Sequence, residues 1–247
     1  MVLSERPEDP LPGHVGIIMD GNGRWARQTG LERLRGHSAG IDAVRETVEA
    51  AAEWGIPNLT LYAFSAENWA RPPAEVKGLM KFLTRFLRSE IDLMKKNGVR
   101  LTGIGRLEDL PAAARDALND AEAATASSEG TRLRLALSYG GRQELVDAAR
   151  ALTRDVQAGN LEPEDVNSEM MASKFYDASM PDLDLVIRTA GERRLSNFLL
   201  WQASYAEFYF SEVLWPDFRR SHFLRAIEDF QKRIRRYGCV PEVAQDK

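Results

Sequence analysis

The sequence is poor in cysteine and has no long uninterrupted run of apolar residues. Its 247 residues include a single cysteine, Cys239, so neither an internal disulfide nor a Cys-rich zinc site can form. A reducing compartment, the cytoplasm, is therefore expected. No stretch approaches the roughly 18–20 apolar residues that a membrane-spanning helix needs. The acidic, Pro-rich segment Met1–Pro12 lacks the basic and apolar regions of a signal peptide.

The chain also lacks the sequence signatures of several large enzyme classes. It contains no G-x-x-x-x-G-K-[ST], G-x-G-x-x-G or H-E-x-x-H pattern, so the usual nucleotide, dinucleotide and zinc-protease sites are not expected. The formal net charge is −4, which favours no nucleic acid partner. Any anion site must therefore be built locally from clustered arginines.

Strand and helix patterns alternate along the chain, which predicts an α/β fold with a central, mostly parallel six-stranded sheet flanked by helices. We expect one domain over residues 14–238, a mobile N-terminal arm over 1–13 and a flexible tail over 239–247. Strands are expected at Val15–Met19, Leu59–Phe64, Val99–Ile104, Leu133–Leu137, Leu183–Ile187 and Phe208–Val213. Helices are expected at Ala39–Trp54, Glu75–Lys96, Pro111–Ala126, Gln143–Ala158, Pro163–Phe175 and His222–Tyr237.

The most informative stretch follows the first predicted strand and reads Asp20-Gly21-Asn22-Gly23-Arg24-Trp25. Two glycines allow the backbone to approach a ligand closely and expose its N–H groups. Open α/β sheets bind ligands at the carboxyl ends of their strands. A carboxylate, bare backbone donors and an arginine there suit a diphosphate with its Mg²⁺. The alternative is an ordinary surface turn containing an Asn-Gly pair.

Two further polar segments lie near predicted strand or helix ends. The segment after the second strand contains Ser65, Ala66, Glu67, Asn68, Trp69 and Arg71. This mixture suits a ligand with a charged head and an apolar body, although a capped turn before Pro72 explains it equally well. Arg33 and His37 lie in a basic turn just before a predicted helix start, where an anion is favoured. A histidine held by ordinary hydrogen bonds is the alternative for His37.

A second arginine-rich turn follows the fifth predicted strand. Arg188, Arg194, Leu195 and Ser196 surround a glycine turn there, and arginine presents forked donors to phosphate. Glu207 lies inside an otherwise apolar, aromatic stretch. A carboxylate in such a place needs a partner, Mg²⁺ or an arginine, to offset its desolvation.

The predicted helix Glu75–Lys96 carries large apolar residues at three- and four-residue spacing. Ordinary core packing explains such a stripe, but the helix can also form the wall of an apolar cleft. Two arginine-rich anion sites, one acidic Mg²⁺ candidate and a long apolar cleft together indicate two phosphorylated substrates with lipid bodies.

Taken together, these motifs resemble the cis-prenyltransferases, specifically the bacterial undecaprenyl diphosphate synthases. The resemblance spans roughly residues 14–238, in order and at the family's spacing. The matching segments are His14–Ala26, Gly36–Gly40, Leu61–Pro72, Tyr139–Arg142, Asp184–Tyr209 and Leu214–Phe218.

The resemblance implies a parallel sheet whose helices enclose an apolar tunnel. It implies a Mg²⁺-dependent homodimer that repeatedly condenses isopentenyl diphosphate onto an allylic diphosphate, usually farnesyl diphosphate, with new double bonds in the cis form. It further implies cytoplasmic location with transient contact at the inner face of the plasma membrane, because a polyprenyl product must enter a bilayer. Supply of the cell-wall lipid carrier is the expected use.

Residue roles follow from the resemblance where positions match. Asp20 is expected to hold Mg²⁺, with Glu207 completing the metal site, and Asn68 to assist proton removal from isopentenyl diphosphate. The allylic diphosphate is expected on residues 21–24, Arg33, His37 and Arg71, with Trp25 and Ser65 near Asn68. Isopentenyl diphosphate is expected on Arg188, Arg194 and Ser196. The family's Arg-x-Gly element, here Arg236-Tyr237-Gly238, is expected to reach the partner subunit.

Small departures from the family pattern occur at Ala66 and Ala190, and neither is expected to abolish activity. The small Ala63 and the absence of an insertion in the Glu75–Lys96 helix predict a product of about undecaprenyl length. Two alternatives compete with this function. One is a short-chain or head-to-middle enzyme of the same fold. The other is a non-catalytic partner subunit; such subunits typically lack the Asp and Arg set that this chain has.

Overall fold

Six parallel strands form the centre of the molecule in the computed structural model, which describes residue 7 and residues 10–234. The strands are β1 (His14–Ile18), β2 (Asn58–Ser65), β3 (Arg100–Ile104), β4 (Arg132–Tyr139), β5 (Leu185–Arg188) and β6 (Glu207–Phe210). Their order across the sheet is β3-β4-β2-β1-β5-β6, and every neighbouring pair is parallel. The predicted α/β fold with a six-stranded sheet is confirmed.

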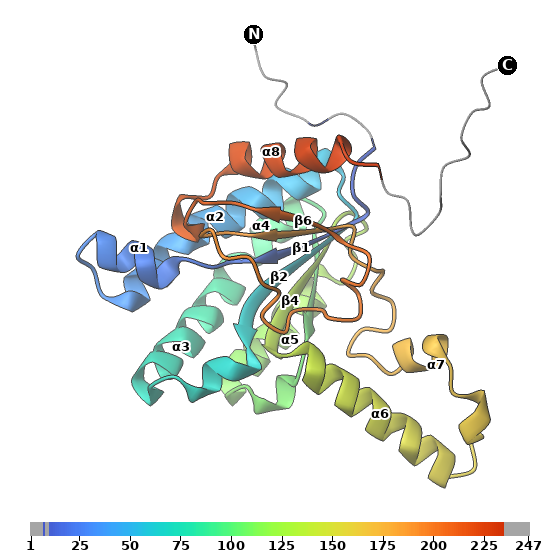
Figure 1. Cartoon of the computed structure of the whole chain (residues 1–247). Coiled ribbons are helices and arrows are strands. Elements are labelled where there is room, and N and C mark those ends of the chain that lie inside the picture. Colours follow the sequence, from blue (N-terminus) through green and yellow to red (C-terminus); the bar gives the residue numbers. More distant parts are fainter. Residues whose placement is uncertain (1–6, 8–9, 235–247) are drawn as a thin grey trace, which may run out of the picture.

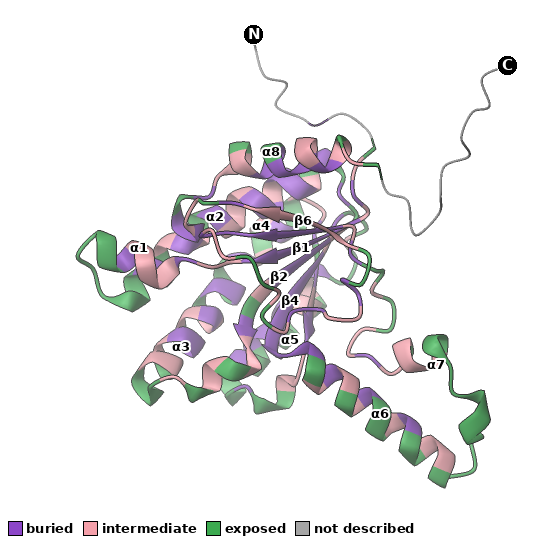
Figure 2. Cartoon of the chain, viewed as in Figure 1, coloured by how far each residue is buried: buried purple, intermediate pink, exposed green. Residues whose placement is uncertain are grey.

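Helices alternate with the strands along most of the chain (Figure 1). They are α1 (Asn22–Gln28), α2 (Arg33–Trp54), α3 (Pro73–Ser89), α4 (Ile91–Lys96), α5 (Ala112–Thr125), α6 (Gly141–Gln157), α7 (Ser168–Ala172) and α8 (Arg220–Gln231). Two short 3-10 turns, η1 (Ala66–Ala70) and η4 (Trp215–Asp217), lie near the ends of strands. Helices α6 and α7 extend away from the body, and Figure 2 shows many exposed residues along both.

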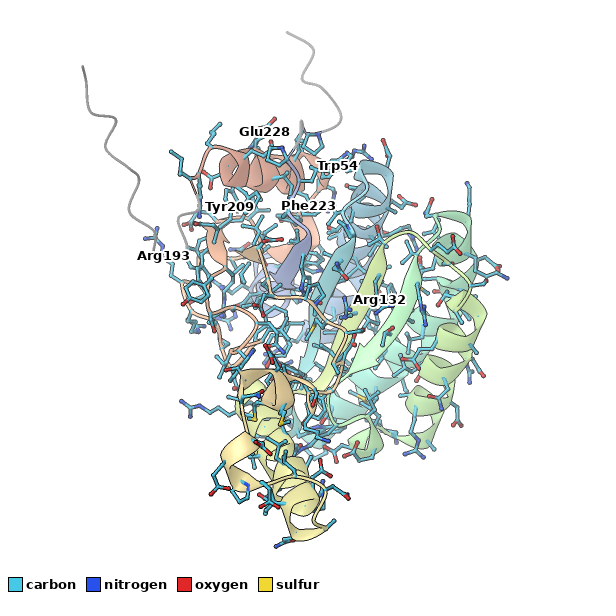
Figure 3. The ribbon with its side chains drawn as sticks, turned by 90° about the vertical axis from the view of Figure 1, so that its right-hand side faces the viewer. Trp54, Arg132, Arg193, Tyr209, Phe223 and Glu228 are labelled. Carbon is cyan, nitrogen blue, oxygen red and sulfur yellow. The ribbon has the colours of Figure 1, made fainter. Side chains whose placement is uncertain are left out.

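The two faces of the sheet are covered in different ways. Val15 and Ile17 of β1 belong to a large apolar cluster to which α2, α3, α5 and α8 contribute. Ile18 belongs to a second, smaller cluster built with the segment between β5 and β6, including Phe198 and Leu199. Trp54 of α2 packs against Phe223 of α8 with ring centroids 5.2 Å apart (Figure 3). Because both faces are covered, β1 is buried at every position.

The outer edge of β3 is closed by side chains of α5. Glu122 accepts a hydrogen bond from the backbone N–H of Gly103 at 2.6 Å, and Thr125 accepts one from that of Leu101 at 3.0 Å. These backbone donors would otherwise be available to the strand of another chain.

The helix boundaries differ from the predicted ones in three places. Helix α2 begins at Arg33 rather than Ala39, and α1 was not predicted, because Gly23, Gly36 and Gly40 lie inside helices where glycine is usually unfavourable. The predicted helix Glu75–Lys96 is divided at Glu90, whose φ of −99° and ψ of 0° end α3.

Two further predicted helices are shorter in the structure. Only Ser168–Ala172 of the predicted helix Pro163–Phe175 is α-helical, after a 3-10 turn at Pro163–Asp165. The last helix ends at Gln231, whereas Cys239, the predicted tail and the Arg236–Gly238 element lie outside the described residues.

Part of the predicted mobile arm is fastened to the body. The backbone N–H of Gly13 donates to Asp184 at 2.7 Å, and Gln231 donates to the carbonyl of Pro10 at 3.2 Å. The rest of the arm, residues 1–6 and 8–9, lies outside the described residues. Among the described helices, none is long and apolar enough to cross a membrane.

Candidate active site

The loop from β1 to α1 requires glycine at position 21. Gly21 has a φ of +109°, and a Cβ atom there would lie 3.1 Å from the Ala190 Cβ and from the Leu214 Cα. Gly23 lies against the side chain of Arg33, whose Nε would be 3.2 Å from an added Cβ. Among the described residues, the backbone N–H groups of residues 22–24 donate to no backbone or side-chain acceptor. This turn therefore presents free donors, as the sequence predicted.

Asp20 lies at the junction of the two predicted anion sites. Ile18 of β1 is paired with Arg188 of β5, which places the two loops that follow these strands side by side. The Asp20 Oδ2 atom is 2.9 Å from Arg188 Nη2, and Oδ1 accepts from the Gly21 N–H at 2.7 Å. Thr189 fixes the Asp20 backbone by accepting from its N–H at 2.9 Å and donating to its carbonyl at 2.6 Å.

The loop after β5 holds its arginines in a strained backbone. Four non-glycine residues between β5 and β6 have positive φ: Ala190 (71°), Ser196 (50°), Asn197 (65°) and Leu199 (39°). Arg188 donates to Ser196 Oγ at 2.7 Å and to the carbonyl of Arg194. Its buried Nε has no partner among the described residues. Such strain concentrates at functional sites, and an unsatisfied guanidinium donor suits an anion.

Arg33 and Arg71 meet at the carboxylate of Glu75, on the first turn of α3. Glu75 Oε1 lies 3.2 Å from Arg33 Nε and 3.1 Å from Arg71 Nη1. Burial, followed by the charge of Arg33, lowers the pKa of Arg71. Two cations therefore share one carboxylate, which leaves a local excess of positive charge beside the glycine turn.

His37 lies in α2 rather than in a turn before a helix. Its pKa is lowered from 6.5 to about 4, mainly by burial and then by the charges of Arg71 and Arg33. The ring is therefore neutral at neutral pH. Gly36 beside it is required because an added Cβ would lie 2.0 Å from the carbonyl oxygen of Asn22. This contact packs the start of α2 directly against the glycine turn.

The segment after β2 divides between the site and the scaffold. Asn68 lines the site's cavity, and its Oδ1 accepts from the Ser65 N–H at 3.2 Å. Glu67 accepts from Asn197 at 2.8 Å and so joins this segment to the loop after β5. Trp69 points elsewhere: its indole donates to Ser138 at 2.9 Å and its ring contacts Phe64. Trp69 therefore fastens η1 to β4.

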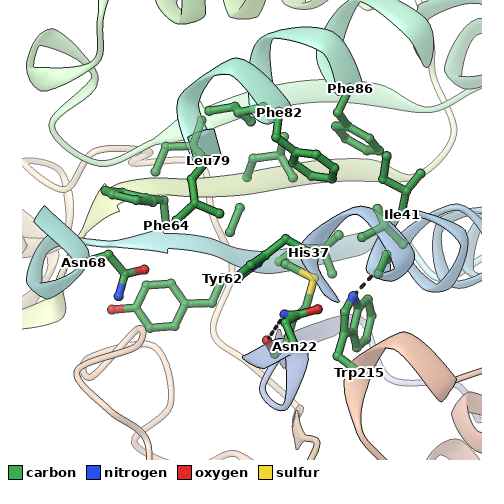
Figure 4. Close-up of a pocket in the computed structure, with 18 of the residues that line it drawn as sticks. Asn22, His37, Ile41, Tyr62, Phe64, Asn68, Leu79, Phe82, Phe86 and Trp215 are labelled. Atoms are coloured by element: carbon green, nitrogen blue, oxygen red, sulfur yellow. Dashed lines mark hydrogen bonds between the residues drawn. The ribbon is translucent and has the colours of Figure 1, made fainter. Parts of the chain in front are cut away.

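A cavity of about 160 Å³ runs from these polar groups into the apolar interior between α2, α3 and the sheet (Figure 4). Asn22, His37, Asn68 and Arg71 line it as polar groups. Its other walls are apolar and include Ile41, Leu79, Leu83, Phe86, Leu135 and Leu137. The predicted helix wall of an apolar cleft is thus present. This division into polar and apolar walls suits a ligand with a charged head and an apolar body.

Trp25 and Glu207 both form contacts that the sequence did not predict. Trp25 donates from its indole to Asp217 of η4 at 2.9 Å, which ties α1 to η4. Glu207 begins β6 and is level with Leu185 at the amino end of the sheet. Leu185 is in turn level with Val15 of β1. Asp20 follows Val15 by five residues and therefore lies about 16 Å further along the strand direction, at roughly 3.3 Å per residue.

Glu207 therefore does not complete a metal site with Asp20 within one chain. Its carboxylate instead pairs with Arg233 at 2.8 Å. The sequence predicted that this carboxylate needs either Mg²⁺ or an arginine as its partner, and the partner in the structure is an arginine.

The segment Gly36–Gly40 also spells G-x-S-x-G, a pattern of serine hydrolases. In those enzymes the serine lies on a sharp turn between a strand and a helix. Ser38 instead lies exposed within α2, so the structure gives no support to a serine nucleophile.

The residues present fit a single Mg²⁺ held mainly by substrate. Within the described residues, no group of three or more His, Cys, Asp or Glu side chains could hold a metal ion. Asp20, with 31% of its side chain exposed, is the carboxylate at the centre of the basic loops. Mg²⁺ commonly binds one or two carboxylates together with substrate phosphates and water, which this arrangement permits.

Sequence reasoning missed three residues that organise the site: Thr189, Glu75 and Glu192. Glu192 pairs with Arg24 at 3.2 Å and also with Arg194. Each is an ordinary polar residue within a loop or the first turn of a helix. Their position beside arginines was the available signal, since a buried or clustered cation requires a counter-charge.

The family model described as putative undecaprenyl diphosphate synthase matches residues 18–238. The chain belongs to this cis-prenyltransferase family. Among curated relatives, the isoprenyl transferase of Chlorobaculum tepidum is 48% identical over 232 residues, covering 94% of this chain and 88% of that protein. The isoprenyl transferase of Agrobacterium fabrum is also 48% identical, covering 94% of both chains. The protein is therefore a cis-prenyltransferase enzyme.

Two solved structures share the fold. Lavandulyl diphosphate synthase from Lavandula x intermedia, solved with dimethylallyl diphosphate, superimposes with a TM-score of 0.91 at 36% identity and covers 93% of this chain and 99% of its own. A probable undecaprenyl diphosphate synthase from Campylobacter jejuni gives a TM-score of 0.77 at 35% identity, covering 94% and 100%. The predicted membership of the family is confirmed.

Proposed function

We propose that this cis-prenyltransferase uses Mg²⁺ to condense isopentenyl diphosphate repeatedly onto farnesyl diphosphate, with cis double bonds, to about undecaprenyl length. The observation that carries this proposal is the cavity itself. Its polar end adjoins two arginine-rich loops, and its apolar end lies between α2, α3 and the sheet. A growing prenyl chain with a diphosphate head fits that division of polarity.

The allylic diphosphate is proposed to bind at the glycine turn. Residues 22–24 supply free backbone N–H groups, and Arg24, Arg33 and Arg71 supply positive charge. Neutral His37 can donate one further hydrogen bond. Ionisation of the allylic substrate moves negative charge onto the departing diphosphate, so these fixed donors stabilise the transition state more than the bound substrate.

Isopentenyl diphosphate is proposed to bind across Arg188, Arg194 and Ser196. Arg188 already bonds to both of the other two residues, and its unsatisfied Nε points to a missing acceptor. Asn68 lines the substrate cavity and is proposed to position the methylene group that loses its proton. An amide is a poor base, so a diphosphate oxygen is the better acceptor for that proton.

Mg²⁺, held by Asp20 and the diphosphate oxygens, would supply charge stabilisation for the leaving group. The chain's own contribution is to orient Asp20 through Thr189 and Gly21. The apolar walls of the cavity exclude water, which would otherwise quench a carbocation-like prenyl group.

We also propose that the enzyme acts as a homodimer. The edge strand β6 is only half-buried throughout, and nearby Tyr205 is 68% exposed. A metal role for Glu207 would require a second copy of the chain, because the carboxylate lies at the far end of the sheet from Asp20. Mixing an Asp20→Ala chain with a Glu207→Ala chain should then restore part of the activity, which neither variant has alone.

We also propose that the enzyme works at the inner face of the plasma membrane, because a polyprenyl diphosphate must enter a bilayer to serve as the cell-wall lipid carrier. Ala63 lines the cavity, and its small side chain is the reason for proposing a long product. The test is chromatography of products formed from farnesyl diphosphate and labelled isopentenyl diphosphate with Mg²⁺. A ladder ending near undecaprenyl length supports the proposal, and products that stop at the length of the starter contradict it.

A further inference from the structure

Helix α3 divides its surface into three adjoining strips. One strip, with Leu79, Leu83 and Phe86, is buried against the cavity. A second, with Val76, Met80 and Thr84, lines an outer groove. The third consists of exposed cations at positions 77, 81, 85 and 88, which fall within one 80° arc at about 100° per residue.

The four cations Lys77, Lys81, Arg85 and Arg88, here called the α3 basic stripe, have no counter-charge on their own helix. The carboxylate of Glu75 is occupied by Arg33 and Arg71. Among the described residues, no carboxylate forms an ion pair with any member of the stripe, although α5 carries the exposed acids Asp116 and Asp120 beyond the groove. A concentrated positive surface is notable in a chain of net charge −4.

The outer groove has a volume of about 490 Å³ and lies between α3, the start of α5 and the end of η1. Its lining is mostly apolar, with Trp69, Val76, Met80, Pro111 and Ala114 among its residues, and it contains no carboxylate. An apolar surface beside a row of Lys and Arg is typical of segments that lie on an anionic bilayer.

The groove and the substrate cavity share a wall. Met80 and Arg71 line both spaces, so one layer of side chains separates them. Methionine is unbranched and adapts its shape readily, which makes this partition easy to rearrange. A prenyl chain inside the cavity is thus one side chain away from the groove.

We propose that the α3 basic stripe and the adjoining groove form the surface by which this enzyme docks on an anionic bilayer. The inference rests on the proposed function, since it places the exit for an apolar product at the membrane. The cations bind lipid phosphates, and the groove receives acyl chains or the departing prenyl chain. The basic surface favours a bilayer over an acidic protein because an apolar groove accompanies it.

The test is flotation of the full-length protein with vesicles made of equal parts phosphatidylglycerol and phosphatidylcholine, compared with phosphatidylcholine alone. The wild type should bind the anionic vesicles and lose that binding as salt rises. Lys81→Gln combined with Arg85→Gln should weaken binding about 25-fold, at roughly fivefold for each cation. The matched control, Arg225→Gln with Lys232→Gln, removes two exposed charges from the region of α8 and should leave binding unchanged.

A second pair of variants tests the groove. Ala113→Asp puts a carboxylate on its rim in the first turn of α5, where an acidic residue is favourable for the helix. It should weaken vesicle binding, whereas Ala123→Asp, on an exposed position further along α5, should not. Equal losses in both pairs would overturn the docking surface, as would equal binding to the two vesicle types.

Wild type that floats with neither vesicle also overturns the proposal, and would assign the stripe to an acidic protein. Elongation measured in detergent without vesicles separates this outcome from failure of the proposed function. Lys81 and Arg85 do not line the cavity, so their variant should elongate normally in that assay. Absence of elongation by the wild type would contradict the proposed function while vesicle binding remained intact.

Discussion

Asp20 and Arg188 hold each other across neighbouring strands, with Oδ2 and Nη2 2.9 Å apart. The contact arises because β1 and β5 are parallel neighbours and end at the same edge of the sheet. It joins the loop proposed for the allylic diphosphate to the loop proposed for isopentenyl diphosphate. A ligand that binds either residue therefore weakens its ion pair with the other.

Replacement of Asp20 should separate catalysis from folding. Asp20→Asn retains the side chain's size and an acceptor for the Gly21 N–H, but removes the negative charge that a metal requires. We expect kcat to fall at least about 100-fold, measured by label incorporation over a Mg²⁺ titration. The unfolding midpoint should fall only modestly, because the amide oxygen can still accept from buried Arg188. Asp42→Asn, at an exposed carboxylate, is the control. Activity within tenfold of the wild type would exclude a metal role for Asp20.

Loss of the Glu75 carboxylate should strengthen diphosphate binding. Glu75→Gln frees Arg33 and Arg71 from their shared partner, so an added diphosphate no longer competes with a carboxylate. Calorimetry with inorganic diphosphate should show about fivefold tighter binding, the equivalent of about 1 kcal/mol. Exposed Glu32→Gln provides a nearby control. Weaker binding would show that Glu75 mainly orients the two arginines.

An alanine at position 21 should cost more than one at position 30. Both glycines have positive φ, but a Cβ at Gly21 would contact Ala190 and Leu214, whereas none of the described atoms lies within 4 Å at Gly30. Urea unfolding should show a loss of about 2 kcal/mol or more for Gly21→Ala and about 1 kcal/mol for Gly30→Ala. Equal losses would mean that the loop after β5 yields without strain.

Stability should fall in mild acid because of His14. Burial lowers the pKa of His14 from 6.5 to about 4, while its ring bonds to Pro181 and Thr60. The unfolded chain therefore takes up a proton first as pH falls, and the stability present above about pH 6.5 is lost progressively toward pH 4.

The variant His14→Gln should lack this contribution of His14 to the loss of stability in acid. Between pH 7 and pH 5, unfolding free energies from urea titrations should fall about 2 kcal/mol less than those of the wild type. Parallel pH profiles for the two proteins would assign the acid sensitivity to other groups.

The location of the site could be predicted from the sequence because it depends only on the order and direction of the strands. Asp20, Asn68 and Arg188 each follow a buried strand, and parallel strands must end together. The strand residues themselves are β-branched or leucine-rich, so buried strands can be recognised without knowing how they pack. Gly21 and Gly36 also belong to motifs that the sequence shows. The sequence cannot show which atoms of other segments lie against them.

The rest depended on contacts between distant segments. Helix α2 extends back to Arg33 through two glycines because Asn22 and Trp215 pack closely against them. A local sequence pattern cannot show these contacts. Glu90 interrupts a continuous apolar stripe because Arg45 of α2 donates two hydrogen bonds to its carboxylate, at 2.8 and 3.1 Å. Glu207 looked close to the site in its motif, yet its position at the start of a strand puts it at the other end.

The hydrogen bonds from the β3 edge to Glu122 and Thr125 limit how copies of this chain can assemble. A fibre built strand upon strand needs two free edges on each molecule. With β3 sealed by its own helix, the described sheet can be prolonged only at β6. Association through strand edges must therefore stop at a pair, so this fold carries its own protection against open-ended aggregation.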